Sequence, residues 1–137
     1  MSLDRKYLLF ALVYAAVGMA LGIAMAASRN HVQFVTHAHV LLVGFVLSLL
    51  YAIIHKLWLP MGTRTLGTVQ FIAHQTGALT LTVGLWLLYG NIVPASNLDP
   101  VLAVASIVVL TGVLLMLVLV VKAGDGHATS SQGRSTA

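Results

Sequence analysis

Long apolar runs constrain the fold of this chain more than any other feature. The sequence of 137 residues contains four of them, at about 7–27, 34–59, 66–89 and 101–121. Each is long enough to cross a bilayer as a helix, since about 20 residues span the hydrocarbon core. Only 7% of the residues are charged, against about 25% in a typical soluble domain. The sequence therefore predicts an all-α integral membrane protein, with a four-helix domain at 1–123 and a disordered polar tail at 124–137.

The few charged residues exclude several classes of protein. There is no cysteine and no glutamate, and the three acidic residues are Asp4, Asp99 and Asp125. Disulfides and thiolate metal sites are thus excluded. None of the aspartates lies inside an apolar run, so a multidrug exporter or proton pump that needs its own carboxylate within the membrane is excluded too. The net charge of +4 comes from residues that flank the runs, which does not favour a nucleic-acid partner.

The distribution of basic residues predicts how the chain lies in its membrane. Lysine and arginine gather on the side that holds both termini and the second connection, and the other side has only Arg29, together with Asp99. By the positive-inside rule, both termini are cytoplasmic. We therefore expect a multi-pass protein of a bacterial-type inner (cytoplasmic) membrane. The basic residues on the terminal side are Arg5, Lys6, Lys56, Arg64, Lys122 and Arg134.

Two histidines separated by one residue, His37 and His39, stand near the start of the second run. An ionisable side chain within the bilayer costs a few kcal/mol, so two in one helical turn indicate a function. Residues i and i+2 of an α-helix point about 200° apart, so the pair is badly placed to hold one metal ion. We expect each imidazole to serve a different neighbour. The alternative is that both histidines only hydrogen-bond helices together.

Each histidine of the pair belongs to its own face of the helix. We expect the face of His37 to be a partly polar, protein-facing seam, and the face of His39 to be an apolar wall for a flat ligand with one coordinating nitrogen. The seam comprises His37, Gly44, Ser48, Tyr51 and His55. The wall comprises His39, Val43, Val46, Leu50 and Ile53.

The third run adds a deeper histidine, His74, followed by Gly77. Glycine on a helix face lets a backbone or a ring approach closely. We expect His74 either to make an interhelical hydrogen bond or to coordinate a metal. The first run contains Gly18 and Gly22 at the GxxxG spacing, which we interpret as plain helix packing.

Imidazole without carboxylate or thiolate suits haem iron, or copper held by histidines. No CxxCH motif is present, so a haem would be non-covalent haem b. Arg29 and His31 precede the second run, where haem propionates would need cationic or hydrogen-bonding partners. Counted at 1.5 Å per residue from the outer ends of their runs, His39 lies about 8 Å deep and His74 about 22 Å deep. A histidine of a neighbouring protomer is therefore a better partner for His39 on one haem than His74 is.

The segment from Thr36 to Phe45, continuing to Tyr51 and His55, resembles helix X of the catalytic subunit of haem-copper oxidases and nitric oxide reductases. In that family an H-x-H pair is followed by small and apolar residues. One histidine is the axial ligand of the high-spin haem, and the other ligates the low-spin haem on the opposite side of the helix. The resemblance implies these roles for His37 and His39 respectively. Together with the residues above, the candidate metal ligands are His37, His39 and His74, and the candidate cofactor-binding residues are these three with Gly44, Gly77, Arg29 and His31.

The same resemblance implies an assembly and a function. The family's subunit has twelve helices in three arcs of four, so this chain resembles one arc, and a homotrimer would rebuild the ring. The implied protein binds haem b, with copper as a possible second metal, and serves electron transfer, haem handling or binding of a diatomic gas. Oxygen reduction is not expected, because the copper-binding His-Pro-Glu-Val-Tyr motif and the adjacent histidine pair are absent. Its partners would be its own copies, the lipid bilayer and a redox protein. The alternatives are a cofactor-free membrane scaffold and a copper-binding protein.

Overall fold

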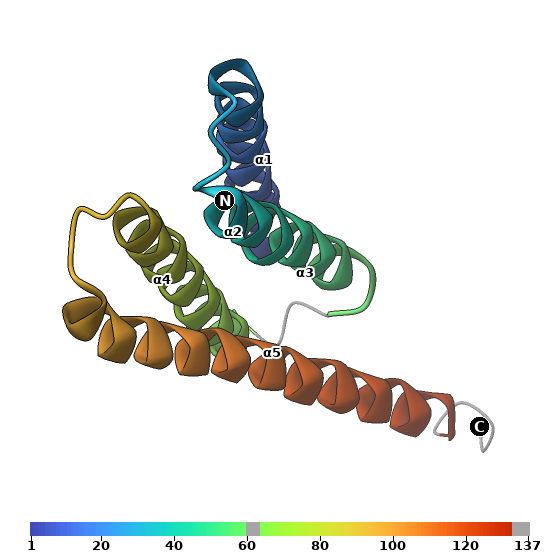
Figure 1. Cartoon of the computed structure of the whole chain (residues 1–137). Helices are drawn as coiled ribbons and strands as arrows, with labels where there is room; N and C mark the ends of the chain where they lie inside the picture. The colour runs from blue at the N-terminus through green and yellow to red at the C-terminus, as the bar shows by residue number, and fades with distance from the viewer. Residues whose placement is uncertain (60–63, 133–137) are drawn as a thin grey trace.

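The protein is all-helical in the residues that the structure describes, which are 1–59 and 64–132, with side chains described in 1–59 and 65–123. The structure is a computed structural model, and Figure 1 shows its helices. In chain order they are α1 (Leu3–Ser28), α2 (Phe34–His39), η1 (Val40–Val46), α3 (Leu47–Leu57), α4 (Arg64–Tyr89) and α5 (Ala95–Gln132). Here α2, η1 and α3 form one continuous rod, in which η1 is a π-helix.

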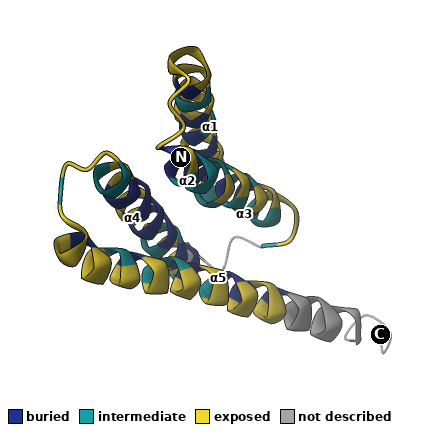
Figure 2. Cartoon of the chain, in the orientation of Figure 1, coloured by how far each residue is buried: buried dark blue, intermediate teal, exposed yellow. Residues whose placement is uncertain are grey.

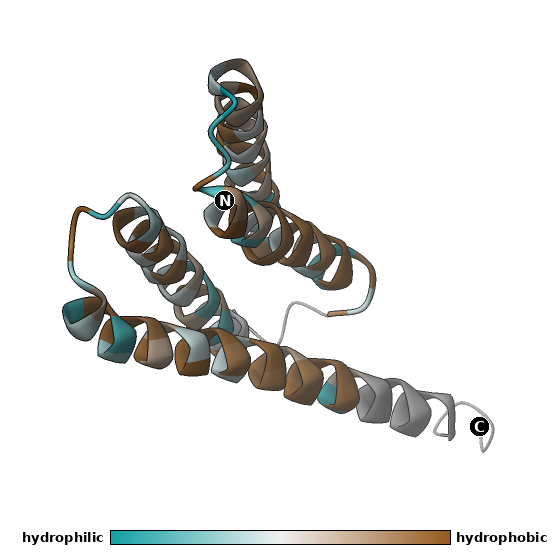
Figure 3. Ribbon diagram, in the orientation of Figure 1, coloured by the Kyte–Doolittle hydropathy of each residue, from teal (hydrophilic) through white to brown (hydrophobic). Residues whose placement is uncertain are grey.

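Four helices are long and apolar enough to cross a membrane, as the sequence predicts (Figure 3). This confirms the all-helical fold with four candidate spans, and indicates a multi-pass membrane protein. The spans are Leu3–Ser28, Phe34–Leu57, Thr65–Tyr89 and Ala95–Ala123.

The fourth span starts earlier than the sequence predicts. The apolar run begins at about residue 101, but α5 begins at Ala95 and contains Pro100. Pro100 is the sixth residue of α5, so the helix lacks the backbone hydrogen bond that an N–H at this position would donate to the carbonyl four residues earlier. At its other end α5 continues to Gln132, into the segment for which disorder is predicted. Residues 133–137 lie outside the described part of the chain, and the disorder of the tail stays a prediction.

The helices pack mainly as two pairs. Helix α5 lies along α4, and α1 lies along η1 and α3, while α2 and η1 join the pairs by their contacts with α4 (Figure 1). A hydrogen bond from Gln33 Nε2 to the carbonyl of Trp86 ties the start of α2 to the end of α4. We call this end of the bundle the α2 end. We call the opposite end, where α1 begins and α3 finishes, the α3 end.

Much of the apolar surface is not covered by the chain itself. In the most apolar part of α5 only 22% of the residues are buried. In the most apolar part of the α2–η1–α3 rod, 28% of the residues are buried. Large exposed apolar side chains follow the outer faces of α1 and α5 (Figure 2). A soluble monomer rarely exposes apolar surface on this scale. Lipid or other protein chains are the surroundings that this surface fits.

The π-helix η1 begins directly after His39, a feature that the apolar pattern did not predict. A π-helix bonds residue i to i+5, so it widens the helix and shifts the register of the residues after it. Such segments are frequent at functional sites. Gly44 lies within η1, and a Cβ added there would come within 2.5 Å of the Tyr14 ring. The absence of a side chain at Gly44 therefore allows the ring of Tyr14 to lie directly on the backbone of η1.

Candidate functional site

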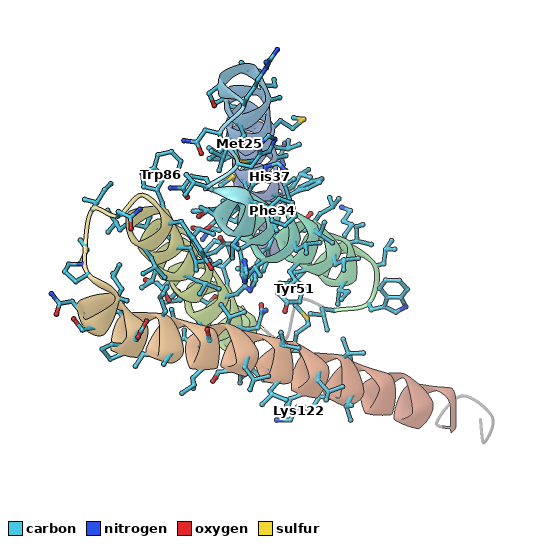
Figure 4. All side chains as sticks on the ribbon, viewed as in Figure 1. Met25, Phe34, His37, Tyr51, Trp86 and Lys122 are labelled. Carbon is cyan, nitrogen blue, oxygen red and sulfur yellow. The ribbon has the colours of Figure 1, made fainter. Side chains whose placement is uncertain are left out.

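His37 lies between α2 and α1 (Figure 4). Its Nδ1 is 2.9 Å from the carbonyl oxygen of Gly18. Its ring also covers Gly22, where an added Cβ would stand 2.9 Å from Cε1. Gly22 thus makes room for the ring of His37, while the missing side chain of Gly18 lets Leu41 and Val40 pack closely, as expected for plain helix packing.

His39 points to a different neighbourhood. Its Nδ1 is 2.8 Å from the carbonyl oxygen of Val35, four residues earlier in the same helix. Both histidines lie in the regular α-helical part of the rod, before η1 begins. The separation of about 200° expected for positions i and i+2 therefore applies to them.

These two contacts fix the tautomer of both rings. A carbonyl oxygen only accepts hydrogen bonds, so Nδ1 of His37 and of His39 must carry the proton. In the neutral imidazole the lone pair is then on Nε2, for which the described residues offer no hydrogen-bond partner. Metal-bound histidines in proteins usually have this arrangement, in which one ring nitrogen donates to a carbonyl and the other faces the metal.

The burial of the rod agrees with the two predicted faces in part. On the seam predicted for His37, the side chains of Ser48 and Tyr51 are buried, and so is Gly44. On the wall predicted for His39, Val46 is 37% exposed, Leu50 47% and Ile53 41%, but Val43 packs against a buried cluster. Because η1 begins directly after His39 and shifts the register, the alignment of the three exposed side chains with the half-buried ring of His39 stays a prediction.

Arg29 and His31 lie in the exposed loop between α1 and α2, at the same end as His37 and His39. Arg29 caps α1 in the left-handed conformation, with φ 53°. Asn30 turns the loop back, since its Oδ1 accepts a hydrogen bond from the backbone of Val32. The structure thus brings four of the candidate residues to the α2 end of the bundle, namely Arg29, His31, His37 and His39.

His74 is at a different level and fully enclosed, with 0% exposure. Its Nε2 lies 3.4 Å from Ser48 Oγ, and its ring meets Tyr51 edge-on, with the ring centroids 4.8 Å apart. Ser48 is nine residues beyond His39, which is about 13 Å along a helix. Of the two roles expected for His74, this contact supports the interhelical hydrogen bond, and coordination stays a prediction.

Gly44 and Gly77 both allow a close approach, but of the protein's own groups. Gly44 meets the Tyr14 ring of α1. An added Cβ at Gly77 would come within 2.9 Å of the Val109 side chain and 3.0 Å of its backbone nitrogen. Gly77 therefore brings α4 and α5 together. A direct contact of either glycine with a cofactor stays a prediction.

Within the described residues, no three His, Cys, Asp or Glu side chains gather where they could hold one metal ion. A copper ion held entirely by one protomer thus gains no support. Two polar residues that organise the bundle, Gln33 and Gln70, are not among the predicted site residues. Gln33 links α2 to Trp86 and accepts from Thr36, and Gln70 accepts from Tyr7 and donates to Gly112. For Gln70 the available signal was a glutamine in an apolar run, because lipid offers it no hydrogen-bond partner.

Comparison of the chain with known protein families, with curated proteins and with solved structures gives no match.

Proposed function

We propose that the protein binds haem b at the α2 end through Nε2 of His37 and His39. The observation that carries the proposal is the shared state of the two rings. Each is held by a backbone carbonyl at Nδ1, with Nε2 left as the ligating nitrogen. The arrangement sets the orientation of both ligands before any iron binds, which is what second-shell hydrogen bonds do in metal sites.

The surroundings of His39 fit a porphyrin face. The exposed side chains of Val46, Leu50 and Ile53 lie further along the rod from this histidine. They would supply apolar contact to a flat macrocycle, while Arg29 and His31 would meet the propionates at the α2 end. The haem protein would serve in electron transfer, in haem handling or in the binding of a diatomic gas. A redox protein would be its partner.

The uncovered wall also favours an oligomer. A haem on His39 would be half enclosed by one protomer, so the second side needs another surface, and closed rings are the usual outcome of heterologous contacts. The resemblance of Thr36–Phe45 to helix X of haem-copper oxidases selects a homotrimer with twelve helices. We place both termini in the cytoplasm of a bacterial-type cell, from the basic residues that flank the spans.

One observation favours a second candidate, a cofactor-free membrane scaffold. The contact between His37 Nδ1 and the Gly18 carbonyl holds α2 to α1 without any metal. It accounts for His37, but it leaves His39 unexplained, since His39 bonds only its own helix. The haem proposal accounts for both.

The visible spectrum of the purified protein tests the proposal. We expect a Soret band, with sharp α and β bands on reduction, and haem extractable by acid acetone. His55→Ala is a matched control, because it removes a histidine from the α3 end of the same rod and is expected to keep the spectrum. A protein without a Soret band, after expression with added haem precursor, would refute the proposal and leave the scaffold; stoichiometric copper in that colourless protein would favour a copper-binding protein.

A further inference from the structure

Four buried side-chain atoms make no hydrogen bond of good geometry in the part of the chain that the structure describes, although the backbone of Val43 lies near the ring of His74. They are Tyr51 Oη, His55 Nε2, His74 Nδ1 and Gln75 Oε1. Tyr51, His74 and Gln75 are more than nine-tenths buried. Leaving a buried polar atom without a partner costs about 1–3 kcal/mol, and surrounding lipid cannot supply the missing bonds.

Other buried polar side chains of the bundle have hydrogen-bond partners. At the α2 end Thr36 donates to Gln33, and Thr82 donates to the Ala78 carbonyl. Beside the unpartnered atoms, the Tyr7 hydroxyl donates to Gln70, which donates to the Gly112 carbonyl. The four unpartnered atoms lie in this one region of the described chain, which indicates that the region holds a further partner.

The four residues belong to one connected cluster. The ring centroids of Tyr7 and His55 are 5.6 Å apart, those of Tyr7 and Tyr51 are 5.4 Å apart, and those of Tyr51 and His74 are 4.8 Å apart. Gln75 joins it by donating from Nε2 to Ser48 Oγ at 3.0 Å. The cluster thus runs from the α3 end, where His55 is only partly buried, to the middle of the bundle.

The hydrogen bonds inside the cluster define what its partner must offer. Ser48 Oγ accepts from Gln75 Nε2 and has His74 Nε2 as the acceptor for its own hydrogen. His74 then carries its proton on Nδ1 as a donor, while Gln75 Oε1 is an acceptor and the Tyr51 hydroxyl is both. A partner for all of them must donate and accept, and be small enough for an enclosed core. Water meets both requirements, and buried waters typically make about three such bonds.

We propose that ordered water molecules in this core link His55 to His74 and form a proton path that enters at the α3 end and stops at mid-bundle. Imidazole, phenol and water can each take up a proton on one side and release one on the other. Ser48 lies seven residues before His55, so the path rises about 10 Å. Beyond it, Tyr14, Val40 and Ala78 form an apolar cluster with Val43 and Phe45, which closes the path before His37 and His39. The proposal does not depend on haem.

Water-edited solid-state NMR of the labelled full-length protein in lipid bilayers tests this inference. We expect polarisation from water to reach the side chains of His74 and Gln75 several-fold faster than Ala78, which lies one helical turn further along α4. Equally slow transfer to all three residues would overturn the proposal.

Two phenylalanine variants sharpen the test. Tyr51→Phe removes one hydroxyl of the path and keeps the ring, so transfer to His74 should slow while transfer to His55 stays as in the wild type. Tyr14→Phe is the matched control from the apolar cluster and should change neither. A Tyr51→Phe protein in which His74 receives polarisation as fast as in the wild type would contradict the path.

Discussion

His37 and His39 at the α2 end and His74 in the middle of the bundle are the same residue type in opposite situations. The first two are half buried, with Nδ1 on a backbone carbonyl and Nε2 unpartnered in the described residues. His74 is fully buried, with Nε2 beside Ser48 and Nδ1 unpartnered. The α2 end leaves one nitrogen of each ring free for the haem ligation that we propose, whereas in the middle Ser48 lies beside the ring of His74. In our proposal, surroundings and not residue type separate a ligand histidine from a core histidine.

The largest effect on haem content should result from His39→Ala. His39 is the histidine on the exposed wall, and its ring makes no hydrogen bond to another helix in the described residues. Its loss should remove haem and leave the fold intact. The haem-to-protein ratio from the pyridine haemochromogen assay should fall to background while the thermal unfolding midpoint changes little. Full haem content in this variant would show that the α2 end is not the ligand region.

For His37→Ala we expect a smaller effect on haem content, together with a small loss of stability. This substitution removes a candidate ligand and also the contact with the Gly18 carbonyl, which is worth about 0.5–1.5 kcal/mol. Haem content should fall in part, or the remaining haem should change its spin state, and the unfolding midpoint should drop slightly. Electron paramagnetic resonance of the oxidised protein measures the spin state. An unchanged spectrum would leave His37 with the packing role alone.

Gly22→Ala should disturb the same ligand without removing it. The added Cβ would meet the His37 ring at 2.9 Å, so the ring must turn and haem affinity should fall several-fold. Gly67→Ala is a closely matched control at the other end, where the added Cβ would meet the His55 ring at 3.1 Å and the Leu3 side chain at 2.9 Å. Haem titration of both variants compares the two ends directly. Equal loss of affinity in both would mean that general packing, not His37, controls binding.

His74→Ala should have the smallest effect on haem and a clear one on stability. Removing an enclosed ring leaves a cavity and deprives Ser48 of its partner, which together cost about 2–4 kcal/mol. We expect haem content near that of the wild type and a lower unfolding midpoint, measured in the same detergent. Complete loss of haem in this variant, with the fold retained, would reverse the contrast between the two regions.

The sequence predicted the helices better than their details. Apolar length was enough to place four spans, because a spanning segment must satisfy its backbone within itself. It could not reveal η1, since no residue type marks a π-helix and the Tyr14–Gly44 contact joins two distant segments. The start of α5 was predicted too late, because the apolar run begins after Pro100 whereas the helix also includes the more polar residues from Ala95 onward.

For the candidate site, the sequence identified which histidines to consider but not their hydrogen bonds. The i, i+2 spacing separates His37 from His39 by helix geometry alone. The carbonyls that fix their tautomers come from Gly18 on another helix and from Val35 one turn back. Counting residues also placed His74 deeper than His39, in agreement with its contact with Ser48. The enclosure of His74 depends on α5 and Gly112, which no local pattern links to it.

Native mass spectrometry of the wild type and of His39→Ala, released from detergent under matched conditions, tests the central claim most directly. It reports oligomer size and haem content on the same particles. The account predicts a wild-type trimer that carries haem and a His39→Ala protein that carries none. A haem-loaded monomer would contradict the shared site, and a His39→Ala protein with wild-type haem content would contradict the ligand assignment itself.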